Sequence, residues 1–221
     1  MDINCGFFNK LIGNIEPEVI STIYGPAGSG KTLSCLLACK DVVDKGGKVL
    51  YIDTESGFSV ERLKQVTDEK FDHILDNILF LRPMTFDEQK ILIENLDEKI
   101  TPDIKLIIVD SISMLYRLEL GKNSEVYESN RELSKQILSL AKTARTHKIP
   151  IVLTNQVYSN MDNGVKMVGG DNLTYMSKCL IELKKHPNSI RSAVLIKHRS
   201  QEENKTIKFK ITQSGIDYSF E

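Results

Sequence analysis

Cysteine is scarce in this 221-residue chain, and its four cysteines follow neither a metal-binding nor a disulfide pattern. They are scattered, and the nearest pair, Cys35 and Cys39, is spaced by four residues on a predicted helix. Zinc sites usually show CxxC or paired His and Cys. We therefore expect reduced, packed thiols, with no zinc site and no disulfide.

Long apolar runs and low-complexity tracts are also missing. The N-terminus MDINCGFFNK lacks the basic start and apolar run of a signal peptide, and no stretch approaches the roughly 20 apolar residues that cross a bilayer. We expect a cytoplasmic protein with no membrane partner. The length and ordinary composition predict one α/β domain over residues 1–221.

The net charge is only −1, but the charges are unevenly placed. From Lys178 to Lys210 there are nine Lys and Arg against three acids, while the first 177 residues carry twenty against twenty-five. Such a basic segment is typical of contact with a phosphate backbone. It is equally typical of a solvated strand face rich in lysine.

Short apolar runs alternate with longer helical patterns, which is the signature of a parallel sheet with crossover helices. The predicted parallel strands are Val19–Tyr24, Lys48–Asp53, Ile78–Arg82, Leu106–Asp110 and Ile151–Asn155. The predicted helices are Lys31–Asp44, Ser59–Glu69, Phe86–Lys99 and Glu125–His147. The later predicted strands, which form an antiparallel meander after a polar loop, are Cys179–Lys184, Arg191–Lys197, Lys205–Thr212 and Ile216–Tyr218. The fold class is thus α/β, with a mostly parallel central sheet flanked by helices and antiparallel C-terminal strands.

The strongest motif is GPAGSGKT, which matches G-x-x-x-x-G-K-[ST] and lies between a predicted strand and a predicted helix. Its backbone amides and the helix N-terminus should face the phosphates of ATP, Lys31 should reach the β and γ phosphates, and the Thr32 hydroxyl should bind Mg²⁺. The predicted nucleotide-binding residues are Gly25, Pro26, Ala27, Gly28, Ser29, Gly30, Lys31, Thr32 and Leu33.

Three further strands end in polar residues. LIIVDS ends at Asp110, which is typical of a Walker B acid that holds Mg²⁺ through water. YIDTES carries Glu55, which could position the attacking water or merely cap a helix. VLTNQV leads to Gln156, which could sense the γ phosphate or simply be a polar residue at the end of a strand.

These elements, in this order, resemble the ATPase core of RecA/RadA recombinases, and the shortened form is most similar to the archaeal RadB group. The matching stretches are GPAGSGKT, YIDTES, LIIVDSISMLYR, VLTNQV, MVGGDNLTYMSKCLIELKK and FKITQSGI. The resemblance implies a RecA-like fold, with Lys31, Glu55 and Gln156 as catalytic residues and Thr32 and Asp110 at the metal.

The resemblance also implies DNA binding in DNA repair and homologous recombination, and it makes residues 157–170 similar to a second DNA-binding loop. The candidate DNA-binding residues are Tyr158, Lys166, Lys197, His198 and Arg199. Tyr158 could stack between bases or pack against its own loop, and His198 could contact a phosphate or fill the strand surface. The triplet Lys197–Arg199 resembles a basic triplet of the RadB group.

The departures from full recombinases shape the expected role. The phosphate loop starts so early that the helical N-terminal domain and the polymerisation linker are expected to be absent, and the stretch after Arg117 has one glycine where recombinases have a glycine-rich loop. We expect an accessory or regulator of the main recombinase with weak ATPase activity. Expected partners are single-stranded DNA, the main RadA recombinase, Holliday-junction processing proteins and further copies in a small homo-oligomer. The alternatives are a filament-forming, DNA-dependent ATPase that exchanges strands and a KaiC-like signalling ATPase.

Overall fold

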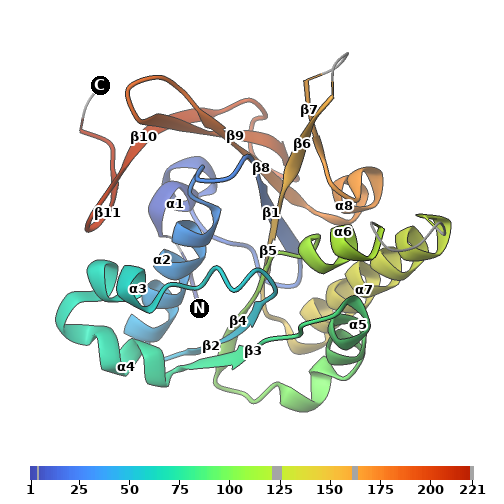
Figure 1. Ribbon diagram of the computed structural model, residues 1–221. Coiled ribbons are helices and arrows are strands. Elements are labelled where there is room, and N and C mark those ends of the chain that lie inside the picture. Colours follow the sequence, from blue (N-terminus) through green and yellow to red (C-terminus); the bar gives the residue numbers. More distant parts are fainter. Residues whose placement is uncertain (4, 121–125, 161–163, 220–221) are drawn as a thin grey trace.

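The computed structural model describes the whole chain except residue 4 and residues 121–125, 161–163 and 220–221 (Figure 1). In this described part the main sheet has nine strands, in the order β11-β10-β9-β8-β1-β5-β4-β2-β3. Their bounds are β1 Ile20–Tyr24, β2 Lys48–Asp53, β3 Ile78–Leu81, β4 Ile104–Asp110, β5 Ile151–Asn155, β8 Cys179–Lys185, β9 Ile190–His198, β10 Thr206–Thr212 and β11 Gly215–Asp217.

The strands from β8 to β3 in that order run parallel, whereas β9, β10 and β11 add antiparallel pairings. This arrangement confirms the predicted fold class. In a parallel sheet all carboxyl ends lie at one edge, and ligands of such sheets bind in the crevice outside that edge. The segments that follow β1, β2, β4 and β5 therefore meet there.

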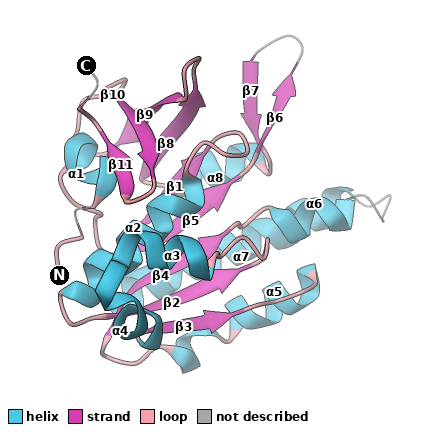
Figure 2. Ribbon diagram, turned by 60° about the vertical axis from the view of Figure 1, so that its left-hand side comes forward, coloured by secondary structure: helices cyan, strands magenta, loops and turns pink. Residues whose placement is uncertain are grey.

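Helices cover both faces of the sheet (Figures 1 and 2). The buried apolar side chains of α1 to α4 belong to one core cluster, and those of α5 to α8 belong to a second cluster on the other face. Their bounds are α1 Gly6–Ile12, α2 Lys31–Asp44, α3 Val60–Thr67, α4 Phe71–Asp76, α5 Phe86–Glu94, α6 Met114–Leu120, α7 Val126–His147 and α8 Gly170–Met176.

Strand β2 shows how one short strand serves both cores. Val49 and Tyr51 belong to the cluster of α1 to α4, and Leu50 and Ile52 belong to the cluster of α5 to α8, each with no exposed surface. Successive side chains of a strand point to opposite faces, so a strand covered on both sides has a continuous apolar sequence.

Two predicted helices end earlier than expected. The helix predicted to run to Glu69 ends at Thr67, where Asp68 adopts a positive φ of 50°, and a 3-10 turn (Asp68–Lys70) and α4 follow. The helix predicted to run to Lys99 ends at Glu94, since the Asn95 side chain donates to the Ile91 carbonyl oxygen (2.8 Å) and a 3-10 turn (Leu96–Lys99) begins.

The sequence did not predict helices α1, α4, α6 and α8 or a small hairpin. The prediction of a loop after Gln156 was wrong in part, because β6 (Val157–Asn160) and β7 (Gly164–Met167) pair as an antiparallel hairpin beside the main sheet (Figure 2). Within the described residues, no helix has the length and apolar character needed to cross a membrane.

Candidate functional site: a phosphate loop beside a polar cleft

The GPAGSGKT motif forms the turn between β1 and α2, at the carboxyl edge of the sheet. Gly28 and Gly30 have φ values of +71° and +109°, which favour glycine, so the loop curls back on itself. A Cβ on Gly25 would lie 2.5 Å from the Leu183 carbonyl oxygen of β8. The first glycine therefore lets the loop lie directly against a neighbouring strand.

Lys31, the first residue of α2, is only 9% exposed, and its ammonium points back into the loop. Its Nζ donates to the carbonyl oxygens of Gly25 (2.9 Å) and Pro26 (3.1 Å). Burial lowers the pKa of Lys31, and the nearby Glu55 and Asp110 oppose that shift. The ammonium is thus held by two main-chain oxygens of the glycine-rich loop.

Asp110, the last residue of β4, is 2% exposed and fixed by both neighbouring strands. Its Oδ2 accepts from the Tyr51 hydroxyl (2.8 Å), and its Oδ1 accepts from Thr154 Oγ1 (2.5 Å). Burial, and then the charge of Asp110, raises the pKa of Tyr51 well above its usual range, so Tyr51 remains a donor. Sequence reasoning missed Tyr51 and Thr154, whose strands flank β4.

Glu55 lies after β2 and beside the start of α2. A Cβ on Gly57 would lie 3.8 Å from the Glu55 Cβ and 3.9 Å from Thr32 Oγ1, so this turn packs close to the threonine hydroxyl. Oε1 of Glu55 accepts from Ser111 Oγ (2.6 Å) and from Gln156 Nε2 (2.8 Å). The structure therefore brings the predicted Glu55 and Gln156 into direct contact.

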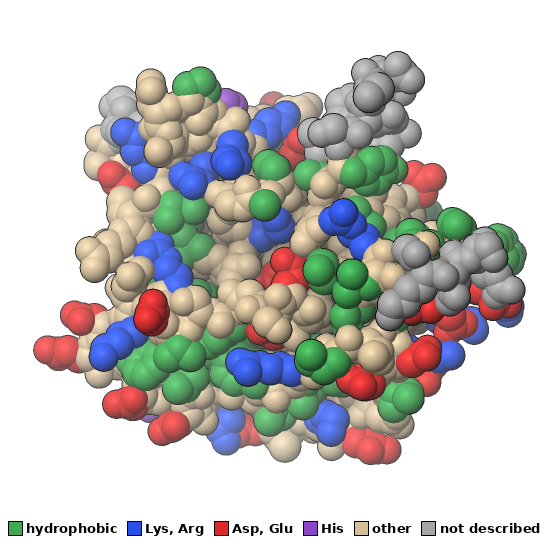
Figure 3. Space-filling view, viewed as in Figure 1, with side chains coloured by type: hydrophobic (Ala, Val, Ile, Leu, Met, Phe, Trp, Pro, Cys, Tyr) green, Lys and Arg blue, Asp and Glu red, His purple; other side chains and the backbone are tan. Residues whose placement is uncertain are grey.

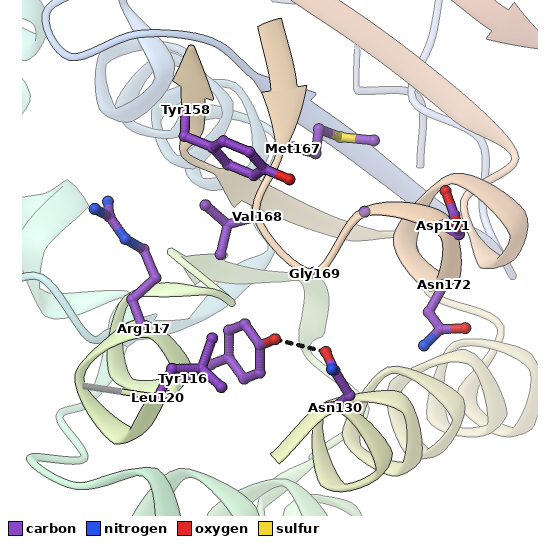
Figure 4. Close-up of a pocket in the computed structure, with 11 residues that line it drawn as sticks. Tyr116, Arg117, Leu120, Asn130, Tyr158, Met167, Val168, Gly169, Asp171 and Asn172 are labelled. Carbon is purple, nitrogen blue, oxygen red and sulfur yellow. Dashed lines mark hydrogen bonds between the residues drawn. The ribbon is translucent and has the colours of Figure 1, made fainter. Parts of the chain in front are cut away.

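A cleft lies between α6, α7, the start of α8 and the hairpin β6–β7 (Figure 4). Arg117 of α6 lines it and donates through Nη1 to Gln156 Oε1. The Tyr116 hydroxyl donates to Asn130 Oδ1 of α7 (2.5 Å), which also lines the cleft. The cleft is lined by Tyr116, Arg117, Leu120, Asn130, Tyr158, Met167, Val168, Gly169, Gly170, Asp171 and Asn172.

Comparison with known proteins places this geometry in a family. The family model described as Rad51 matches residues 5–219. The chain belongs to the Rad51 family.

Its relatives include proteins named DNA repair and recombination protein RadB. The protein from Methanococcus maripaludis strain C7 is 42% identical over 208 residues, covering 94% of this chain and 95% of its own length. The protein from Methanobrevibacter smithii is 40% identical, covering 96% and 93%. A solved structure titled as the RadB recombinase has a TM-score of 0.79 at 34% identity and covers 94% of each chain. These matches confirm the resemblance that the motifs indicated.

The candidate DNA-binding residues of this Rad51-family chain fall into two groups that the structure does not bring together. Tyr158 follows β5 at the carboxyl edge and is 50% exposed. Lys166 pairs with it across the hairpin, but its side chain lies outside the described residues. His198 pairs with Cys179, next to Ser21 near the start of β1, so residues 197–199 lie toward the opposite end of the strands.

The Lys197–Arg199 triplet makes contacts within the chain. Lys197 Nζ donates to the Thr174 carbonyl oxygen (2.8 Å), and Arg199 Nε lies 2.7 Å from Glu16 Oε2. The His198 side chain is 2% exposed, and burial lowers its pKa. On the face seen in Figure 3, other Lys and Arg side chains gather over the C-terminal strands.

One residue of the basic segment instead contacts the phosphate loop. Arg191, the second residue of β9, donates through Nε to the Gly28 carbonyl oxygen (3.1 Å). A Cβ on Gly28 would also lie 3.9 Å from Lys185 Nζ. Only the fold could reveal this contact, because 163 positions separate Arg191 from Gly28.

Proposed function

We propose that this Rad51-family chain binds ATP with Mg²⁺, binds DNA, and acts in DNA repair and recombination as an accessory to the main recombinase, with slow ATP hydrolysis. One observation carries the nucleotide part of the proposal. The buried ammonium of Lys31 lies in a glycine-rich loop. Two acids at the ends of adjacent strands, Glu55 and Asp110, favour its charged form. The relatives named for DNA repair and recombination support the biological part.

The phosphate loop fits the terminal phosphates of ATP. Glycines let its backbone curl, and it leads into the N-terminus of the 14-residue helix α2, where backbone amides favour an anion. The Ser29 hydroxyl is buried and has no hydrogen-bond partner in the described part of the chain. A ligand rich in acceptor oxygens would satisfy this group and the Lys31 ammonium together.

The donor set also fits Mg²⁺, which prefers oxygen ligands and keeps several waters. Thr32 would offer its hydroxyl, and Asp110 would hold a bound water while Tyr51 and Thr154 fix its orientation. The described residues contain no cluster of three or more His, Cys, Asp and Glu that could hold a metal. A bound Mg²⁺ would enter together with the nucleotide, and it would neutralise developing charge on the phosphates.

The remaining residues have distinct tasks in hydrolysis. Glu55 orients the attacking water. Gln156 contacts the terminal phosphate, and its position changes with the presence of that phosphate, which couples the nucleotide to the β6–β7 hairpin. In the present arrangement Oε1 of Glu55 already accepts two hydrogen bonds, from Ser111 and Gln156. This engagement favours slow turnover, because the carboxylate that would orient the water is already held by two protein donors.

DNA binding is proposed at the cleft side of the carboxyl edge. Tyr158 offers half of its surface to solvent there, and base stacking on an aromatic side chain contributes about 1–3 kcal/mol. Arg117 supplies a cation on the same cleft. The Lys197–Arg199 triplet is a second candidate for DNA contact. To bind phosphate, Arg199 would have to leave Glu16 and Lys197 would have to leave the Thr174 carbonyl oxygen.

The test of nucleotide binding is Lys31→Ala, measured by isothermal titration of Mg²⁺-ATP. We expect binding to weaken by a hundredfold or more while the thermal transition of the free protein stays cooperative. Lys40→Ala is the matched control, because Lys40 lies on the same helix and pairs with Asp44 at the surface. Equal affinity in Lys31→Ala and Lys40→Ala would refute the site.

The accessory role is tested by light scattering with and without ATP and single-stranded DNA, followed by pull-down with the main RadA recombinase and Holliday-junction processing proteins. We expect a small assembly under every condition. A long filament that appears with ATP and DNA would favour a strand-exchange protein, and absence of any DNA binding would favour a signalling ATPase.

A further inference from the structure

A chain of hydrogen bonds connects the cleft to the proposed catalytic glutamate. Arg117 Nη1 donates to Gln156 Oε1, and Gln156 Nε2 donates to Glu55 Oε1 (2.8 Å). The three residues come from α6, from the residue after β5 and from the turn after β2. Arg117 is exposed and lines the cleft, while Glu55 lies on the side of the phosphate loop.

The two partners of Gln156 fix which way its amide faces. A guanidinium only donates hydrogen bonds, and a carboxylate accepts them. If the amide turned by 180°, its NH₂ would face the guanidinium and its oxygen would face the carboxylate, so both hydrogen bonds would be lost. Arg117 therefore sets the orientation in which Gln156 donates to Glu55.

This orientation restrains the catalytic group. Both Gln156 and Ser111 donate to the same oxygen of Glu55. While Arg117 holds the amide, Gln156 is kept on Glu55 and away from a terminal phosphate.

We propose that Arg117 is a positioning residue that holds Gln156 and Glu55 in a resting arrangement and thereby links occupancy of the cleft to the rate of ATP hydrolysis. The inference rests on the proposed function, since it assigns regulation of the same ATP site. A nucleic-acid phosphate that takes the guanidinium in the cleft releases the Gln156 amide, as deletion of the Arg117 side chain does.

The first test needs no nucleotide. The side-chain NH₂ resonances of Gln156, assigned by their loss in Gln156→Ala, are followed by NMR in the wild type, Arg117→Ala and Arg117→Lys. We expect slow exchange with water in the wild type, faster exchange in Arg117→Ala, and partial restoration in Arg117→Lys, which keeps a donor. Unchanged exchange in Arg117→Ala overturns the proposal even if ATP binding proves correct.

The second test is single-turnover hydrolysis of Mg²⁺-ATP. We expect Arg117→Ala to raise the rate about three- to tenfold, the scale of one hydrogen bond, and to leave ATP affinity within about twofold. The increase should disappear in the Gln156→Ala background, whereas an increase that persists there shows that Arg117 acts by another route. Arg131→Ala is the control for loss of an exposed arginine on the neighbouring helix α7. An Arg117→Ala rate equal to or below the wild type overturns the proposal.

The link to the cleft is tested by adding single-stranded oligothymidine. It should raise the wild-type rate and leave the Arg117→Ala rate unchanged. Stimulation of both proteins, or of neither, contradicts a link through Arg117. If no variant binds ATP, the proposed function fails instead, and the NMR result alone decides the role of Arg117.

Discussion

Replacement of Gly25 by alanine tests whether the packing of the phosphate loop against β8 sets nucleotide affinity. The new Cβ would lie 2.5 Å from the Leu183 carbonyl oxygen, 3.1 Å from the Leu183 Cβ and 3.1 Å from Ser29 Oγ. The Leu183 carbonyl oxygen is a backbone atom and the Leu183 Cβ is attached directly to the backbone of β8. Neither can move away by a side-chain rotation, as the end of a long side chain could. The start of the loop must therefore move away from the sheet.

The magnitude follows from known costs of overpacking. An extra group forced into a well-packed site costs about 1–3 kcal/mol. For a domain of this size, each kcal/mol lowers Tm by about 2–4 °C. We expect Gly25→Ala to lower Tm by about 2–12 °C and to weaken Mg²⁺-ATP binding at least tenfold.

Gly46→Ala is the control that separates a general loss of stability from a displaced phosphate loop. Gly46 follows α2 with a φ of +79°, and nothing lies within 4 Å of its added Cβ. It should show only the cost of left-handed backbone strain, about 1–2 kcal/mol, with unchanged ATP affinity. Scanning calorimetry and titration of both variants decide the matter. If Gly25→Ala bound ATP as tightly as Gly46→Ala, loop position would not control the site.

Three further outcomes follow from the same contacts. Asp110→Asn should weaken ATP binding about tenfold with Mg²⁺ present and much less without it, as titrations in Mg²⁺ and in EDTA would show; equal weakening in both would remove Asp110 from the metal. Burial lowers the pKa of His198, so the unfolded chain takes up a proton at a higher pH than the folded one. The wild type should therefore lose more stability than His198→Gln as pH falls from 6.5 through the folded-state pKa, and parallel Tm curves would contradict this. Tyr158→Ala should weaken single-stranded DNA binding about fivefold or more at constant salt slope, measured by fluorescence anisotropy, whereas an altered slope with no loss would point to phosphate contacts alone.

The parallel half of the fold was predictable because its signals are local and strong. Apolar runs such as residues 49–52 are buried on both faces, and the phosphate loop has its own spacing. The amphipathic helix at the centre of the second core was equally clear, because Leu133, Ile137 and Leu140 recur at helical spacing and are buried. These signals suffice to predict that Lys31 and Asp110 lie at one edge of the sheet.

Features set by tertiary contact escaped sequence reasoning. Helix α1 is only seven residues long, and its Phe7 packs against Phe209 of β10 at a ring-centroid distance of 5.8 Å. Only the fold shows why position 169 is a glycine, since a Cβ there would lie 2.6 Å from Leu133 Cδ2.

Long-range pairings in the site were hidden for the same reason. The separation of Arg117 from Gln156 is 39 positions, and that of Gln156 from Glu55 is 101. Strand order, which brings β2, β4 and β5 together, is what assembles them. In the basic C-terminal segment, residues that are neighbours in the sequence have separate contacts. Arg191 contacts the phosphate loop, whereas Lys197 contacts α8.

The most direct measurement of the central claim is a crystal structure of the chain with Mg²⁺ and a non-hydrolysable ATP analogue. We expect the terminal phosphates to lie in the Gly25–Thr32 loop, Lys31 Nζ to leave the Gly25 and Pro26 carbonyl oxygens for them, and Mg²⁺ to lie between Thr32 and the water held by Asp110. A nucleotide bound elsewhere, or a Lys31 ammonium still on those carbonyl oxygens beside an occupied loop, would contradict it.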